Sequence, residues 1–374
     1  MTLRPRLKAV PVHRDGADLV ISPRALQRVY LADPNGSVAF LLRLLSEGRH
    51  PANGLRVAMA AQGFRVTDEE ITDVLAALDG MGVLEDADGD AVLDPATRER
   101  HESNLRYFDL FARLDRTSAG MLQALHGSRV LLLGAGGVGS GVLQSLVGLG
   151  VGEVTVVDFD VVEPKNLARQ FVYGESALGR PKVLAAADWV AAYSGGTRVV
   201  PVQARVDSAA AIQRLGVRAD IVVCAIDSPP QAPLLVNEAC FALGVPMVYG
   251  ALNYSTLAYW SVDPGRAPCR RCLELHRDDE LPTLPTALRQ DPFIAPPSVN
   301  RATGPVVQLV CGLMSLEIVR YLTRVEPPVA AATYHVVELA DGMTTFGTPW
   351  QHHPDCPLCA QARTALPPPT EAAG

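Results

Sequence analysis

The chain has 374 residues, enough for two or three domains whose cores need no disulfides. Its formal net charge of −7 and its lack of a basic run argue against a nucleic-acid binder. The amino terminus has no apolar segment of the kind that directs secretion, so we expect no secretion signal. The uncharged stretch 130–152 contains eight glycines and opens on a strand-like run, so we do not predict a membrane span there.

Two amphipathic helices are predicted near the amino terminus. Ser37 is placed to cap a helix that stops at Gly48. Thr67 and Glu70 form a capping box for a second helix with an apolar face at 71, 74, 75 and 78.

Strand patterns surround these helices. Residues 19–21 predict a short strand, and 83–94 predict a hairpin that turns at Asp88 and Gly89. Together these elements indicate a winged-helix-like α+β domain over residues 1–95. The alternative is a generic α+β segment whose only role is to pack against the rest of the protein.

Residues 96–362 predict a second, α/β domain. A charged helix over 98–114 leads into it, and strands and helices then alternate from Arg129 onward, which is typical of a Rossmann-like doubly wound, mostly parallel sheet. We expect a loop over the site at 273–303, a long apolar helix at 304–322 and a disordered tail at 363–374.

A glycine-rich loop follows the first strand of this domain and opens a helix. Gly134 permits a tight turn, Gly136 and its neighbour Gly137 let a phosphate approach the backbone, and Gly139 lets helix and strand pack closely. Asp158, about twenty residues on, is placed to bind a ribose hydroxyl. This pattern predicts a nucleotide-binding site but does not specify which nucleotide binds there.

The polar residues that follow indicate a reacting triphosphate rather than a dinucleotide. In a doubly wound sheet the carboxyl ends of the strands meet at one crevice. Arginine and lysine there neutralise phosphates, and a carboxylate after a strand can hold Mg²⁺. The residues expected at this crevice are Asp160, Asn166, Arg169, Gln170, Lys182 and Asp227.

Residues 104–360 resemble the adenylyltransferase superfamily of ubiquitin-activating enzymes, in particular the thiamine and molybdopterin types. The matching stretches are GAGGVGS, DFDVVEPKNLARQ, GRPKV, IVVCAID and two CxxC pairs, in the family's order. The resemblance implies that a carboxylate attacks the α-phosphate of ATP, and that an acyl-adenylate forms as pyrophosphate leaves. It also implies a homodimer.

The resemblance implies a role for each matching residue. Asp158 would bind the ribose, and Asp160 and Gln170 would line the nucleotide site. Asn166, Arg169 and Lys182 would hold the triphosphate. Asp227 would coordinate Mg²⁺. In this sequence Asp109 stands where relatives often carry an arginine that reaches the partner subunit's ATP; Arg106 or Arg113 could replace it.

Two Cys-x-x-Cys pairs predict a structural zinc site. Cys269 with Cys272, and Cys356 with Cys359, offer four thiolates for a closed tetrahedral Zn²⁺ site, and a redox-active dithiol is the alternative. His352 and His353 are expected at the surface. Such a pattern without a secretion signal favours a reducing cytoplasm.

The other cysteines are expected to be inert. Cys224, Cys240 and Cys311 lie in predicted core strands or helices, and 273–303 contain no cysteine. Members of the resembled superfamily that form a thioester carry a reactive cysteine there, so we predict no thioester step.

The amino-terminal pattern is similar to precursor-recognition domains of peptide natural-product biosynthesis, as in microcin-type adenylyltransferases. Such a domain would capture a leader peptide by strand addition. The sequence thus favours an adenylyltransferase acting on a ribosomal precursor peptide. A non-catalytic leader-delivery protein that partners a cyclodehydratase, and an adenylyltransferase for a sulfur-carrier protein, remain alternatives.

Overall fold

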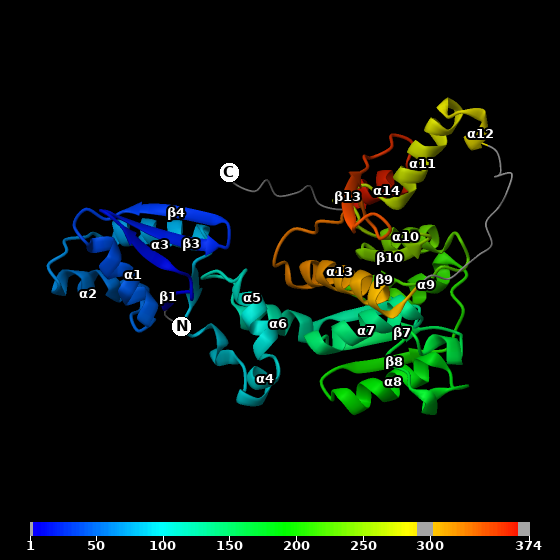
Figure 1. The fold of residues 1–374 in the computed structure, drawn as a ribbon, viewed down its shortest axis with the longest axis horizontal. Helices are drawn as coiled ribbons and strands as arrows, with labels where there is room; N and C mark the ends of the chain where they lie inside the picture. The colour runs from blue at the N-terminus through cyan, green and yellow to red at the C-terminus, as the bar shows by residue number, and fades with distance from the viewer. Residues whose placement is uncertain (1–2, 290–301, 366–374) are drawn as a thin grey trace. The chain divides into compact units, whose positions relative to one another are not determined.

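A computed structural model describes residues 3–289 and 302–365. The chain forms two compact units, Met1–Ala124 and Leu125–Gly374 (Figure 1). The domain boundary predicted near residue 95 lies within the first unit.

The first unit contains two small antiparallel sheets. β1 (Pro5–Leu7) pairs with β5 (Leu84–Asp86), and β2 (Val12–Asp15), β3 (Asp18–Arg24) and β4 (Gln27–Ala32) form a sheet in the order β2-β3-β4. The strand predicted at 19–21 is therefore confirmed. The predicted hairpin is wrong, because β5 takes β1 as its partner and Gly89–Val92 is a 3-10 turn, η2.

Helices α1 (Ser37–Glu47), α2 (Leu55–Ala61) and α3 (Asp68–Gly80), with the short turn η1 (Ala52–Gly54), complete its core. The capping box of Thr67 with Glu70 and the left-handed Gly48 after α1 are confirmed. Ser37 is not the cap. Gly36 precedes the helix, and the buried Asp33 accepts the Val38 N–H at 2.9 Å in its place.

Three further helices follow: α4 (Pro95–Arg100), α5 (Glu102–Asp109) and α6 (Ser118–Gly127). The single helix predicted over 98–114 is therefore wrong. His101 leaves the helical conformation between α4 and α5 (φ −105°, ψ 19°), and α5 ends at Asp109. The charge pattern of the segment did not signal this break.

The second unit is built on an eight-stranded sheet in the order β13-β12-β11-β10-β9-β6-β7-β8. The five strands from β10 to β8 are parallel, and β11 to β13 extend the sheet with antiparallel pairs. The predicted α/β class with a mostly parallel sheet is confirmed. The strands are β6 (Arg129–Leu133), β7 (Glu153–Val157), β8 (Arg198–Val202), β9 (Ile221–Cys224), β10 (Met247–Asn253), β11 (Thr256–Val262), β12 (Thr333–Glu338) and β13 (Thr344–Pro349).

Helices cover both faces of this sheet. Met247 of β10 packs in one core with residues of α9 and α10, whereas Gly250 meets Met314 of α13. Because side chains three apart on a strand point to opposite faces, α13 and its neighbour α7 cover the other face. The helices and turns are α7 (Gly137–Leu149), η3 (Pro164–Asn166), η4 (Glu175–Ala177), α8 (Lys182–Tyr193), α9 (Ala209–Gly216), α10 (Ala232–Leu243), α11 (Arg270–Glu280), η5 (Leu281–Thr283), α12 (Thr286–Arg289), α13 (Gly304–Thr323) and α14 (Pro357–Ala365).

The segments predicted as irregular are partly helical. α11 and α12 occupy the start of the loop expected at 273–303, and α14 extends into the tail expected from 363. Residues 290–301 and 366–374 lie outside the described part of the chain. α13 is as predicted, and it has the length and apolarity to cross a membrane, but half of its apolar window is buried against the rest of the fold.

Candidate active site

A cavity of about 810 Å³ lies at the carboxyl ends of the central parallel strands. This is the position at which doubly wound sheets bind ligands. It gathers residues from the ends of β6, β7 and β9, from the chain after β7 and from the start of α8. The predicted residues that line it are Gly134, Gly136, Gly137, Asp158, Asp160, Asn166, Arg169, Gln170, Lys182 and Asp227.

The glycines of the loop have the distinct uses that their spacing predicted. A Cβ on Gly134 (φ 101°) would lie 2.5 Å from the Ala225 carbonyl oxygen, and one on Gly139 would lie 1.9 Å from the Gly134 carbonyl oxygen. Gly139 therefore serves packing and does not line the cavity. A Cβ on Gly136 would meet nothing within 4 Å, which leaves space for a ligand beside the backbone.

Asp158 organises the glycine loop. Its Oδ2 accepts the Ala135 N–H at 2.7 Å, and its Oδ1 accepts the Asp160 N–H at 2.7 Å. The Tyr173 hydroxyl donates to the Ala135 carbonyl at 2.8 Å from the other side. Burial, and then the nearby Asp158 carboxylate, raise the pKa of Tyr173, so it remains a donor. Tyr173 was missed, because no motif links it to a loop 38 residues away.

Two buried amides line the cavity. Asn166 is 3% exposed, and its Oδ1 accepts the Glu163 N–H at 2.9 Å, which fixes the turn η3. Gln170 is 2% exposed, and its Oε1 has no hydrogen-bond partner among the described residues. A buried amide oxygen without a partner is costly, so this position suits a ligand that donates a hydrogen bond.

The cations of the site differ in how they are held. Lys182 is the first residue of α8; its side chain is 6% exposed, and its Nζ pairs with Asp160 Oδ2 at 3.0 Å. Arg169 donates to the Lys165 carbonyl at 2.9 Å. Asp227, after β9, contributes a carboxylate to the same cavity.

The residue types in this cavity suit an anion, with a carboxylate beside it. The start of α7 directs free N–H groups at the cavity, and Lys182 and Arg169 add positive charge. The Asp227 carboxylate is an oxygen ligand of the kind that Mg²⁺ prefers. The cavity can therefore neutralise a triphosphate while a carboxylate approaches it.

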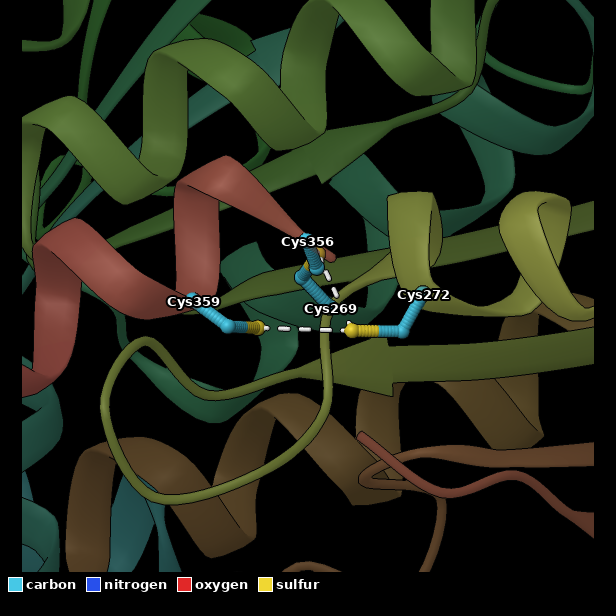
Figure 2. A group of neighbouring side chains, drawn as sticks. All are labelled: Cys269, Cys272, Cys356 and Cys359. Carbon is cyan, nitrogen blue, oxygen red and sulfur yellow. Dashed lines mark hydrogen bonds between the residues drawn. The ribbon is translucent and has the colours of Figure 1, made fainter. Parts of the chain in front are cut away.

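The four predicted cysteines meet in the second unit, from the start of α11 and the start of α14 (Figure 2). Their Sγ atoms all lie within 4.8 Å of one another, with Cys269–Cys356 at 3.4 Å and Cys272–Cys359 at 3.5 Å. Tetrahedral Zn²⁺ with Zn–S bonds of about 2.3 Å needs sulfurs about 3.8 Å apart, so the site fits structural zinc.

The surroundings of the cluster hold its cysteines in place. Within the cluster, the hydrogen bond between the thiols of Cys269 and Cys359 lowers the pKa of Cys359 and raises the pKa of Cys269. Trp350 Nε1 donates to the Cys269 carbonyl at 3.0 Å and holds the first knuckle in place. The expected surface position of His353 is wrong, since it is 7% exposed and its Nε2 lies 2.9 Å from Asp279 Oδ2.

Asp109 has local partners within the first unit. Its Oδ1 accepts a hydrogen bond from the Ser118 hydroxyl at the start of α6, and its Oδ2 pairs with Arg106 at 3.2 Å. Arg113 lies beside Gly82, and its backbone exchanges hydrogen bonds with Arg116. Asp109 therefore joins α5 to α6, a structural use that its position in the sequence did not indicate.

Several known proteins are similar to this chain. The chain is 34% identical to the SAMP-activating enzyme E1 of Haloferax volcanii over 235 residues, 63% of this chain and 81% of that protein. It is 32% identical to the sulfur carrier protein adenylyltransferase of Thermus thermophilus over 250 residues, 65% and 86% of the two chains. Its fold matches E. coli MccB solved with ATP, with a TM-score of 0.71, 15% identity, and coverage of 95% and 99%.

The sequence model of the ThiF family matches residues 108–358, which contain every predicted residue of the cavity and three of the four clustered cysteines, and Cys359 directly follows the match. The chain therefore belongs to the ThiF family and is an ATP-dependent adenylyltransferase of this type.

Proposed function

We propose that this enzyme activates a carboxylate of a ribosomally made precursor peptide as an acyl-adenylate. The observation that carries the proposal is the first unit. The fold likeness to MccB covers 95% of the chain, whereas the relatives named for carrier proteins align with only 63% and 65% of it. One of the matching structures holds MccB, described as a microcin biosynthetic enzyme, in complex with N-formylated MccA.

The cavity residues would act by position and charge. A peptide carboxylate oxygen attacks the α-phosphorus of ATP, the bond to the bridging oxygen breaks, and pyrophosphate leaves with its charge. Asn166, Arg169 and Lys182 would stabilise the charge that develops on the phosphates, Asp158 would hold the ribose, and Asp227 would hold Mg²⁺.

The three-stranded sheet of the first unit is our candidate for the leader-binding surface. β2 and β4 each pair with β3 alone among the described strands, so each has a free edge. β4 carries the exposed Tyr30, and Leu26 before it is also exposed. An extended leader peptide would add a strand to one of these edges through backbone hydrogen bonds.

The product adenylate would meet its nucleophile directly, without a thioester. Burial raises the pKa of both Cys224 and Cys311 to about 12, so neither thiol is a ready nucleophile at neutral pH. Cys311 Sγ donates to the Val138 carbonyl within the packed interface of α13 with α7. An amide nitrogen of the peptide, an amine or a sulfur donor would then complete the reaction.

Adenylation of a sulfur-carrier protein is the second candidate. The two relatives above favour it by name, at 34% and 32% identity. The first unit counts against it, because the matches to these two relatives cover only 63% and 65% of this chain, whereas the fold likeness to MccB covers 95%. For either substrate we further propose a homodimer that works in the cytoplasm.

The test uses the intact protein, MgATP and two acceptors, with pyrophosphate release as the readout. One acceptor is a candidate precursor peptide encoded beside the gene, and the other is a carrier protein ending in Gly-Gly. Pyrophosphate released only with the precursor, and lost when its leader is removed, supports the proposal. Release only with the carrier overturns it in favour of the second candidate. Mass spectrometry of the quenched reaction checks for an enzyme-bound thioester.

A further inference from the structure

Phe159 directly follows Asp158, lines the cavity and is 41% exposed as a residue. The guanidinium of Arg205 lies over this ring, with its Cζ 3.7 Å from the ring centroid. That distance corresponds to stacking on the aromatic face. An exposed phenylalanine with an arginine stacked on it therefore stands at the edge of the cavity.

Arg205 has no other partner among residues 3–289 and 302–365. Other arginines near the cavity are held by protein oxygens, as Arg169 is by the Lys165 carbonyl and Arg180 by Asp188. Arg205 forms no hydrogen bond or ion pair with the described residues, so the ring alone positions it. The contact is of the cation–π kind, and a guanidinium is well suited to stack on an aromatic face.

The pair lies beside Asp158, on the side of the cavity where a nucleobase is expected. The glycine loop, Lys182 and Arg169 occupy the phosphate end of the cavity, and Asp158 is the expected ribose ligand. The base leaves the ribose on the side away from the phosphates. The wall beside Asp158 is formed by Phe159 and by Ala204 and Val206, the two neighbours of Arg205, and it is apolar as a flat base requires.

We propose that Phe159 is the stacking platform for the nucleobase and that Arg205 is a positioning residue that acts through it. A cation on one face of a ring fixes its orientation and draws electron density from it, which favours an electron-rich purine on the other face. A purine overlaps the ring more than a pyrimidine does. Arg205 would therefore contribute to the preference for ATP over CTP. The inference rests on the ATP-binding half of the proposed function and is independent of the acceptor.

The test measures binding of the non-hydrolysable analogues of MgATP and MgCTP by calorimetry, with no acceptor present. Arg205→Met keeps the length of the side chain and removes the charge and the planar group. We expect the ATP-analogue Kd to rise about 2- to 5-fold, with a smaller change for the CTP analogue, so that the ratio of the two Kd values moves toward one. Loss of a distant positive charge would weaken both triphosphates equally and leave this ratio unchanged.

Two further variants isolate the mechanism. Arg198→Met removes an exposed arginine at the start of β8 that pairs with Glu153, and we expect no change in the ratio. Phe159→Leu keeps an apolar side chain without a ring, and we expect the ATP-analogue Kd to rise about 5-fold or more. In the Phe159→Leu protein, Arg205→Met should not raise the ATP-analogue Kd further, because the ring through which Arg205 acts is absent.

Equal loss of ATP and CTP affinity in Arg205→Met, or an undiminished effect of that change in the Phe159→Leu background, overturns the inference. If the native protein binds neither analogue, both the ATP site of the proposed function and this inference are wrong. If the native protein binds ATP and the ratio is the same in all variants, only the inference fails.

Discussion

Lys182 Nζ lies 3.0 Å from Asp160 Oδ2, and the lysine side chain is 6% exposed while that of Asp160 is 48% exposed. The Asp160 carboxylate compensates the charge of the buried Lys182 ammonium at the wall of the cavity. Lys165 lines the same cavity, but it is 73% exposed and pairs with Glu163. The two lysines therefore form a natural comparison between a buried and a solvated charge.

Lys182→Met should lower kcat for adenylate formation at least about 100-fold, because a preorganised charge in a dry site is worth several kcal/mol in the transition state. Lys165→Met should change kcat less than about 3-fold, since water screens an exposed charge. Pyrophosphate release measured at saturating ATP distinguishes the two. Equal effects of the two substitutions would contradict the assignment of Lys182.

The cysteine cluster should bind one Zn²⁺ ion per chain. Cys356→Ser should lose the metal and lower the unfolding temperature, because α11 and α14 are joined through the site. Cys311→Ala removes a buried thiol far from the cluster in sequence and should keep the full zinc content. Elemental analysis with thermal unfolding checks both. A full zinc content in Cys356→Ser would refute the four-thiolate site.

The residues that line the cavity were predictable because their pattern is local in the sequence. The glycine loop and the segment from Asp158 to Gln170 are each defined by spacing between near neighbours, and the sheet brings them together in a known way. The cysteine pairs were predictable for the same reason. Their meeting across 87 residues follows from the preference of zinc for four thiolates.

The wrong and missed predictions concern residues whose partners lie far away along the chain. Such contacts leave no signal in the neighbouring sequence. The hairpin prediction failed because β5 pairs with β1, about 80 residues away along the chain. Arg4 reinforces that pairing by donating to Asp88 at 2.7 Å, next to the predicted turn. Tyr173 and the stacked pair of Phe159 and Arg205 also depend on contacts across the fold. An exposed arginine in the sequence gives no sign of the ring that it will cover.

Asp33 should contribute to the stability of the first unit in a pH-dependent way. Burial acts to raise the pKa of its carboxyl, but hydrogen bonds from Arg14 and from the N–H groups of Val38 and Ala39 outweigh it and hold the pKa below 3.8. A depressed pKa in the folded state means that the stabilisation is present above the unfolded value and is lost as pH falls through the folded one.

Asp33→Asn should therefore destabilise the protein by about 1–3 kcal/mol at pH 7, because it removes the charge that Arg14 and the start of α1 bind. The difference from the native protein should be constant between pH 7 and pH 5 and shrink only below the ordinary carboxyl pKa of 3.8. Urea unfolding at several pH values measures it. A difference that declines already near pH 6 would assign the effect to another group.

Lys8 should give a pH dependence of the same sign, but in an alkaline window. Its Nζ donates to the Gly82 and Ala112 carbonyls at 2.9 and 2.7 Å, while burial, and then the nearby Arg113, lower its pKa from 10.5 to about 8. Between these two values the unfolded chain binds more protons than the folded one, so the free energy of unfolding should rise with pH across that window. Lys8→Met should lose this rise. Thermal unfolding from pH 7.5 to 10 compares the two proteins, and an identical slope in both would show that Lys8 is not the group that titrates.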